Sequence, residues 1–300
     1  MSISHYIKDI GRGRHGARAL DRAQAADLMG QILDGEVDDL QLGAFCIAMR
    51  IKGETNQEMA GFLDATHARL QLISTPDPVV VLPSYNGARK LPVLTPLLAH
   101  LIAREGVAVV IHGTATESSR ITSEDVLNAM GNHALVNKRE IQAGEVVFVP
   151  TQVLCPSLKR LLDVRRTVGL RNSAHSMVKL MNPTTTTNAL LISSYTHPEY
   201  ALAMAATFEL TNTRALLLRG TEGEAVADAR RTPQMDVFAR GIRSQLVPAQ
   251  TGSLIHLPEL PTTIDAASTA RYTLAVLNGE LPIPAPIAAQ VQAALKSLSF

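Results

Sequence analysis

The chain has 300 residues, 46% of them hydrophobic, which is enough to bury one large core or two joined cores. A formal net charge of +1 points to no particular partner, and aromatic residues make up only 4% with no tryptophan, so platforms for stacking nucleic-acid bases are scarce. No uninterrupted apolar run approaches the roughly 20 residues that cross a bilayer, which predicts a soluble, cytoplasmic protein with no membrane partner.

Only helical patterns occupy the first 70 residues or so. Asp21 followed by Gln24 is typical of a helix start, and apolar residues follow it at helical spacing. A second helix is expected to end at Gly53. Thr55 with Glu58 has the spacing of a capping box and predicts the start of a third helix.

The pattern changes to α/β from residue 75 onward. Short apolar runs predict strands, and longer periodic segments predict helices between them. The expected strands are residues 79–82, 107–111, 146–149, 189–195 and 215–218. The expected helices include residues 97–103, 198–210, 264–277 and 287–298. The two cysteines, Cys46 and Cys155, lack the spacing of metal ligands and are expected to be reduced.

One stretch, residues 107–131, combines a buried strand, a loop rich in hydroxyl groups and the start of a helix. Thr122 and Asp125 have the spacing of a further capping box, and Gly131 lies where a left-handed helix end is expected. A strand, a polar loop and a helix N-terminus together are a common anion-binding arrangement in α/β proteins.

Three segments resemble the anthranilate phosphoribosyltransferase family, and the resemblance covers nearly the whole chain. The matching residues are Lys52-Gly53-Glu54-Thr55, then His112-Gly113 with Ser118, Ser119 and Arg120, and finally Gly169, Arg171, Asn182 and Pro183. The resemblance implies an α/β protein with the nucleoside phosphorylase/phosphoribosyltransferase fold (glycosyltransferase family 3-like). It implies a small all-helical domain at residues 1–72, with a returning segment near 157–185, and a larger α/β domain at residues 73–300.

The catalytic parts of that family are mostly missing here. The place of its glycine-rich diphosphate loop is held by residues 83–88, PSYNGA, which keep one glycine of four, and proline removes a backbone donor. Ile111 replaces a lysine, and Ala225-Val226 replace the acidic magnesium pair. We therefore interpret residues 83–88 as an ordinary turn and expect no cofactor, Mg²⁺ included.

What remains is a vestigial substrate and phosphate site, with no catalytic or metal-binding residue expected. Its members would be Asn86, Gly87, Lys90, Thr95, His112, Gly113, Ser118, Ser119 and Arg120. His112 is interpreted as a hydrogen-bonded structural residue, because it has no acid, nucleophile or metal partner at fixed spacing. Lys90 beside Arg89 is equally compatible with an anion contact and with plain exposure. Glu222 and Glu224, near the lost acidic pair, are interpreted as a solvated surface.

The positive signal is a basic block at residues 159–179. It contains Lys159, Arg160, Arg165, Arg166, Arg171 and Lys179, against the single carboxylate of Asp163. Such a run is usually a solvated helix face. By the resemblance, however, it borders the cleft between the domains, and the family dimerises through its helical domain, which would double the block. The diverged YbiB-like branch of the family, which this chain resembles, is associated with sequence-independent nucleic-acid binding.

These observations predict a homodimer, formed through the helical domain, that binds nucleic acid through phosphates without sequence preference. The expected ligand is DNA, especially single-stranded DNA, or RNA. Arg12, Arg14 and Arg18 would add a mobile basic contact. Two alternatives stay open: a phosphoribosyl or glycosyl transferase with an unidentified acceptor, and a protein that only scaffolds another. Residues 83–88 discriminate between enzyme and binding protein, because an enzyme needs free phosphate donors there.

Overall fold

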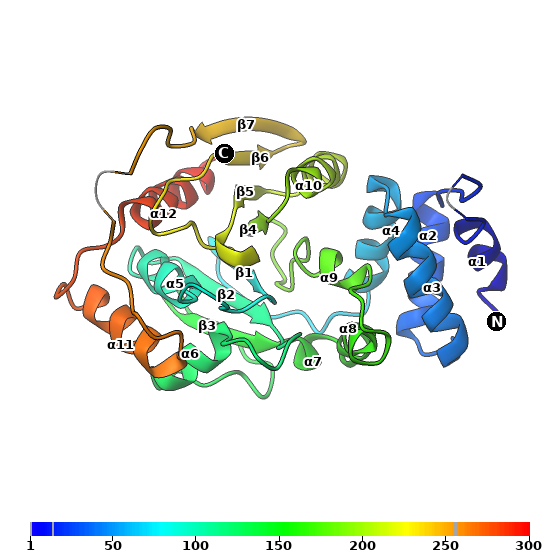
Figure 1. The fold of residues 1–300 in the computed structure, drawn as a ribbon, viewed down its shortest axis with the longest axis horizontal. Coiled ribbons are helices and arrows are strands. Elements are labelled where there is room, and N and C mark those ends of the chain that lie inside the picture. Colours follow the sequence, from blue (N-terminus) through cyan, green and yellow to red (C-terminus); the bar gives the residue numbers. More distant parts are fainter. Residues whose placement is uncertain (1, 14, 255–256) are drawn as a thin grey trace.

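The structure, a computed structural model, describes residues 2–13, 15–254 and 257–300, and it places a group of helices beside a larger α/β part (Figure 1). The first four helices form one end of the molecule. They are α1 Ser4–Ile10, α2 Arg22–Leu33, α3 Asp39–Lys52 and α4 Asn56–His67. The chain therefore has a small helical part and a larger α/β part, as predicted.

Helix starts in the first part follow from local side-chain chemistry. Both predicted capping boxes are present, with Asp21 bonded to Gln24 before α2 and Thr55 bonded to Glu58 before α4. The buried Glu58 carboxylate also accepts from the Leu20 amide at 3.0 Å and from the Lys52 ammonium at 2.6 Å. One carboxylate thus joins the end of α3, the start of α4 and the entry to α2.

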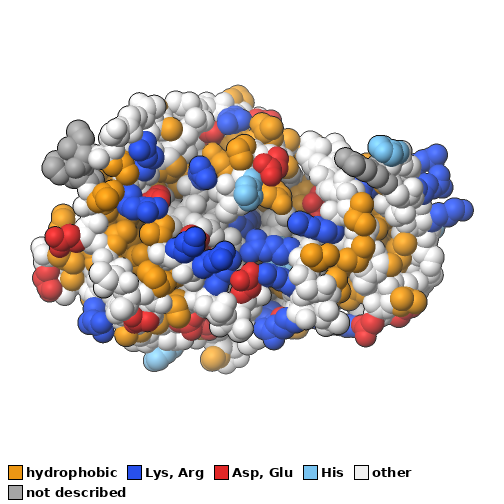
Figure 2. Space-filling model, viewed as in Figure 1, with side chains coloured by type: hydrophobic (Ala, Val, Ile, Leu, Met, Phe, Trp, Pro, Cys, Tyr) orange, Lys and Arg blue, Asp and Glu red, His pale blue; other side chains and the backbone are white. Residues whose placement is uncertain are grey.

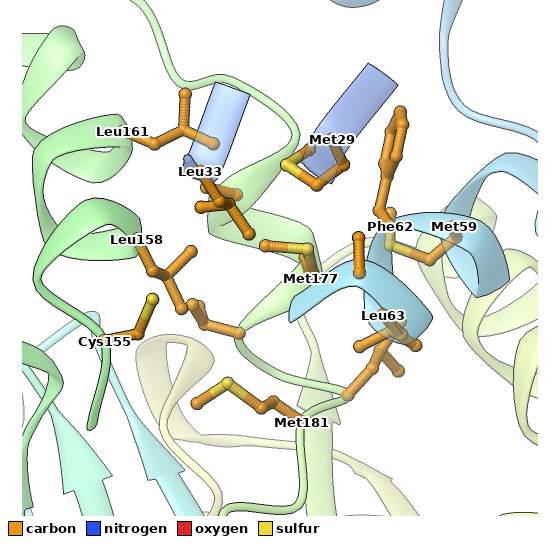
Figure 3. Packing of buried hydrophobic residues seen from close by; sticks show 14 of the residues in the cluster. Met29, Leu33, Met59, Phe62, Leu63, Cys155, Leu158, Leu161, Met177 and Met181 are labelled. Carbon is orange, nitrogen blue, oxygen red and sulfur yellow. The ribbon is translucent and has the colours of Figure 1, made fainter. Parts of the chain in front are cut away.

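Three further helices return to this first part after the strand β3 Val146–Pro150. They are α7 Thr151–Leu154, α8 Pro156–Val168 and α9 Ala174–Met177. Figure 3 shows Leu158 and Leu161 of α8 facing the same core as Met29 of α2 and Phe62 of α4. Burial of these apolar side chains holds α8 and α9 against the helical part.

A seven-stranded sheet forms the α/β part, in the order β3-β2-β1-β4-β5-β6-β7. The first five strands are parallel, and β6 and β7 are antiparallel additions at one edge. The strands are β1 Val79–Ser84, β2 Ala108–Gly113, β3 Val146–Pro150, β4 Leu190–Tyr195, β5 Ala215–Arg219, β6 Met235–Ala239 and β7 Ile242–Val247. The other helices are α5 Thr95–Ala103, α6 Ser123–Ala129, α10 Pro198–Thr211, α11 Ala266–Leu277 and α12 Ala285–Ser297, with the short 3-10 helix η1 Thr221–Gly223.

Both faces of the central strands are buried, because alternate side chains enter two different cores. Val79 and Val81 pack in the core that includes the helical part, whereas Val80 and Leu82 pack in the core that contains residues of α5 and α12. Strands covered on both faces read as continuous apolar runs, which is why the sequence predicts them.

The hairpin of β6 and β7 is absent from the sequence-based prediction. Its turn is Arg240-Gly241, where both residues have positive φ (53° and 73°), as two-residue hairpin turns require. The outer strand β7 carries mostly exposed side chains, so its apolar content is too low for the pattern to indicate a strand. Pairing with β6 decides its conformation.

Candidate functional site

Four loops meet at the carboxyl edge of the parallel strands, where α/β proteins usually bind ligands. They follow β1, β2, β4 and β5. The order of connections reverses between β1 and β4, because β2 and β3 lie on one side of β1 whereas β4 and β5 lie on the other. This strand order brings together residues 85–91, 114–120, 195–197 and 220–224, although they are far apart along the chain.

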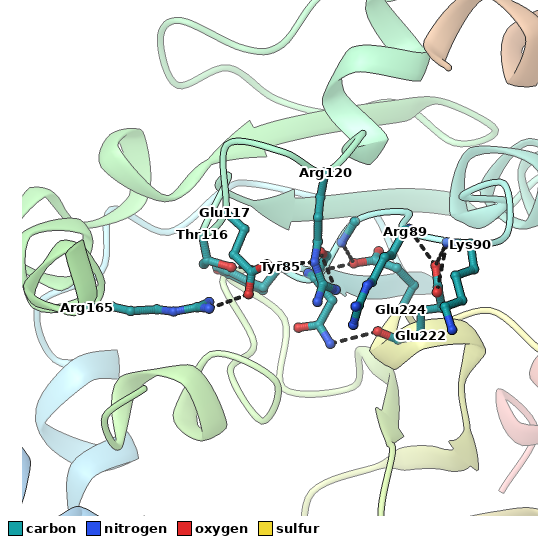
Figure 4. Close-up of polar contacts among 11 residues, drawn as sticks. Tyr85, Arg89, Lys90, Thr116, Glu117, Arg120, Arg165, Glu222 and Glu224 are labelled. Atoms are coloured by element: carbon teal, nitrogen blue, oxygen red, sulfur yellow. Dashed lines mark hydrogen bonds and ion pairs between the residues drawn. The ribbon is translucent and has the colours of Figure 1, made fainter. Parts of the chain in front are cut away.

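The loop after β1 binds an anion that the protein itself supplies (Figure 4). One carboxylate oxygen of Glu224, Oε1, accepts from the backbone amides of Asn86 and Gly87, both at 2.8 Å. The other, Oε2, accepts from the hydroxyls of Ser84 at 2.6 Å and Thr95 at 3.2 Å. Only 1% of Glu224 is exposed. These four donors form what we call the inner site.

A second carboxylate fills a neighbouring cluster of backbone donors, the outer site. Glu222 accepts from the amides of Arg89 at 2.6 Å, Lys90 at 3.0 Å and Leu91 at 3.5 Å. The side chains of Arg89 and Lys90 are exposed beside it. Both carboxylates come from one short segment after β5.

The interpretation of Glu222 and Glu224 as a solvated surface is therefore wrong. Glu224 is buried because the inner site satisfies its charge, and no part of the local sequence reveals donors that lie on a distant loop. Gly223 allows this close approach: its φ is +90°, and a Cβ there would lie 1.8 Å from the side-chain nitrogen Nδ2 of Asn86. The turn at residues 83–88 is likewise more than the ordinary turn that was predicted, because the amides of Asn86 and Gly87 converge on one acceptor.

The other predicted vestigial residues take different positions. His112 is fully buried, and its Nδ1 lies 2.8 Å from the Tyr85 hydroxyl. Burial lowers the pKa of His112 to about 3, so the ring is neutral and hydrogen-bonded, in agreement with a structural role. Gly113 lies against the backbone of Ser84, where a Cβ would come within 1.9 Å. Ser118 and Ser119 are exposed, so these hydroxyls take no part in the inner site.

The structure divides the basic block into two groups. The outer group lies on α8 and is neutralised locally: Lys159 and Arg166 both pair with Asp163, and Arg160 pairs with Asp39 at 2.9 Å. These three cations share two carboxylates, so the outer group still offers positive charge, but less than the sequence indicates.

The inner group faces the loops at the sheet edge. Arg165 extends from α8 to Glu117 in the loop after β2, and Arg120 pairs with the same carboxylate at 3.0 Å (Figure 4). The two guanidinium groups lower the pKa of Glu117, with the hydrogen bond from Arg165 as the main cause. Within the described ranges, Arg171 has neither a hydrogen bond nor an ion pair. Burial lowers the pKa of Arg171, and the nearby positive charges of Arg165 and Arg120 lower it further.

Lys179 lies deeper than an exposed phosphate contact would. Its ammonium donates to the Gly223 carbonyl oxygen at 2.8 Å, and burial lowers its pKa to about 8. Together with Arg171 and His175, it lines a cavity of about 580 Å³ between the helical part and the ends of β4 and α10. The apolar wall includes Met49 and Met204, and the carboxylates of Glu54 and Glu199 also border the cavity.

Sequence reasoning missed Glu117, the acidic residue at the centre of the inner group. Its side chain holds Arg165 and Arg120, which come from different elements, so no spacing along the chain identifies it. His175 was not singled out either. It is 9% exposed, lines the cavity, and its Nε2 has no hydrogen-bond partner among the described residues. Arg12 and Arg18 are exposed near the N-terminus, and Arg14 lies outside the described residues.

Across residues 2–13, 15–254 and 257–300, no group of three or more His, Cys, Asp or Glu side chains is placed to hold a metal ion. In the same part of the chain, no helix is long and apolar enough to cross a membrane.

Comparison with known proteins places this arrangement in a family. Residues 4–69 match the family model described as "Glycosyl transferase family, helical bundle domain". The protein YbiB of Escherichia coli (strain K12) is 39% identical over 302 residues, an alignment that covers 98% of this chain and 94% of YbiB. The chain belongs to the YbiB-like branch of the anthranilate phosphoribosyltransferase family.

More distant relatives of this chain carry the names of enzymes. The anthranilate phosphoribosyltransferase of Methanopyrus kandleri is 27% identical over 277 residues, covering 89% of this chain and 82% of the enzyme. The solved structure of that enzyme from Thermus thermophilus has a TM-score of 0.76 at 23% identity, covering 97% of this chain and 87% of that one. The structure of the Saccharomyces cerevisiae enzyme in complex with PRPP and Mg has a TM-score of 0.71 at 15% identity. This alignment covers 99% of this chain and 96% of the yeast chain. The predicted fold is confirmed.

Proposed function

We propose that this YbiB-like protein binds nucleic acid, without sequence preference, on a phosphoribosyltransferase scaffold that no longer carries out transfer. The observation that supports this most is the inner cationic group, Arg120, Arg165 and Arg171, which shares only one carboxylate, Glu117. Figure 2 shows Lys and Arg side chains gathered near the middle of one face of the molecule. A phosphate backbone would supply the counter-charge that this group lacks.

The state of the donor loop favours binding over transfer. A transferase acting on a diphosphate ester needs free donors at the end of β1, and here the inner and outer sites are filled by Glu224 and Glu222. A nucleic-acid-binding protein needs no such donors. The cationic group adjoins the filled loop, where Arg120 donates to the Asn86 carbonyl oxygen at 3.2 Å. We expect phosphates to bind the guanidinium groups while both carboxylates stay in place.

Replacing Arg120, Arg165 and Arg171 together with alanine is expected to weaken binding of single-stranded DNA of every sequence alike. Each lost phosphate contact should also flatten the slope of log affinity against log salt by about 0.7. Fluorescence anisotropy with a labelled oligonucleotide at several salt concentrations measures both quantities. In the reverse direction, Glu117→Gln removes the competing carboxylate and should tighten binding.

A matched control removes three cations from the opposite edge of the sheet. Arg104 follows α5, and Lys138 and Arg139 precede β3, so all three lie near the amino ends of the strands. Their triple alanine variant changes the net charge equally and should keep the parental salt slope. If both triple variants weaken binding to the same degree, the cationic group is not the contact surface and only overall charge matters.

The predicted homodimer also belongs to this proposal. Leu40 and Ile51 of α3 are 85% and 67% exposed, and a groove lined by Ile7, Ile10 and Ile47 separates α1 from α3. Exposed apolar surface of this kind suits a second copy of the chain. Sedimentation equilibrium at micromolar concentration should give twice the 32.2 kDa mass of one chain, and Ile51→Glu should shift the particle towards one chain. A single-chain particle of the parent protein would contradict the dimer.

A further inference from the structure

We propose that the segment from Gly220 to Glu224 is a built-in replacement for a diphosphate, whose two carboxylates close two adjacent anion sites at the end of β1. The inference does not depend on nucleic-acid binding. It concerns the inner and outer sites alone, and the ligand class that they admit or exclude.

The inner site has the composition of an oxyanion site. All four groups that contact Glu224 donate: two backbone amides, of Asn86 and Gly87, and two hydroxyls, of Ser84 and Thr95. Nothing in this set is specific for a carboxylate, because phosphate oxygens accept from amides and hydroxyls in the same way. Gly87 has φ +68°, and a Cβ there would come within 2.7 Å of the Ile121 carbonyl oxygen, so this turn requires glycine.

The outer site repeats the arrangement with backbone donors alone. Three successive amides, from Arg89 to Leu91, converge on Glu222, and the exposed side chains of Arg89 and Lys90 add positive charge. Glu222 reaches this position in a left-handed conformation, with φ 52°, which non-glycine residues rarely adopt. The contacts with the amides thus hold Glu222 in an unfavourable backbone state.

The two sites lie in series on one loop, since Gly87 of the inner site and Arg89 of the outer site are two residues apart. Two linked anions on a short tether satisfy both sites at once, and in this chain the tether is the polypeptide between Glu222 and Glu224. A free diphosphate has the same number of linked anionic groups. Because the tethered carboxylates are always present, the parent protein should not bind free diphosphate, including the diphosphate part of a nucleotide.

Removing the carboxylates should open the sites. We expect no binding of inorganic diphosphate to the parent protein at millimolar concentration in isothermal titration calorimetry. Glu222→Ala should bind it weakly through the outer site. The double variant Glu222→Ala/Glu224→Ala should bind about tenfold more tightly than the single variant, because hydrogen bonds to a charged group each contribute on that scale. Glu105→Ala/Glu140→Ala, which removes two exposed carboxylates elsewhere, should bind no better than the parent.

Thermal unfolding keeps the test decisive if the double variant is poorly folded. Diphosphate should then raise its melting temperature towards the parental value, acetate should do so less, and neither should affect the parent. The proposal is overturned if the parent binds diphosphate as tightly as the variants do. It is equally overturned if neither Glu222→Ala nor the double variant gains diphosphate binding or thermal stabilisation beyond the control pair.

Discussion

Replacing Glu224 with alanine is expected to lower the free energy of unfolding by about 3 kcal/mol or more. The change leaves two backbone amides and two hydroxyls at a buried position without their acceptor. Buried donors without a partner each cost about 1–3 kcal/mol, and water entering the new space would recover part of that loss. Urea denaturation followed by circular dichroism measures the difference from the parent.

Two companion variants show whether the cause is the lost carboxylate. Glu224→Gln keeps the shape and one carbonyl acceptor, so its loss should be smaller than that of alanine. Glu222→Ala removes a carboxylate that is only partly buried, and alanine reduces the strain of the left-handed backbone only slightly. We expect it to lower the free energy of unfolding by about 1 kcal/mol. If the free energy of unfolding of Glu224→Ala lies within about 0.5 kcal/mol of the parental value, the inner site does not hold the loops together.

Gly61→Ala is expected to destabilise the helical part by about 2–3 kcal/mol. Gly61 lies in α4 where this helix crosses α2, and a Cβ there would come within 2.3 Å of the Arg22 carbonyl oxygen and 2.8 Å of the Ala25 Cβ. Neither neighbour can move alone, because both belong to the start of α2. The helices would have to separate, and the packing of core residues such as Met29 and Phe62 would loosen (Figure 3).

The matched control is the same substitution at Gly43. This glycine lies in α3, has no atom within 4 Å of an added Cβ and has no positive φ. Alanine there should stabilise the protein by up to about 1 kcal/mol, because glycine is a poor helix former. Chemical denaturation of both variants should therefore give changes of opposite sign. Equal changes at the two positions would contradict the close packing of α2 and α4.

The sequence by itself determined the elements whose causes are local. Capping boxes at Asp21, Thr55 and Thr122 are read from residues three apart, and all three are present as predicted. The five parallel strands are visible as apolar runs, because both of their faces are buried. The antiparallel hairpin was missed, since β7 is an edge strand with polar side chains and its conformation depends on pairing.

The candidate site depended on tertiary structure. The family resemblance implies that the charged parts of the catalytic loops are missing, but it could not show what fills the remaining donors. Glu224 reaches Asn86 across 138 positions of the chain, and Arg165 reaches Glu117 across 48. Hydrogen bonds and ion pairs act over a few ångströms in space, without regard to distance along the chain. Only the order of strands in the sheet, which brings the loops after β1, β2 and β5 to one edge, decides which charges meet.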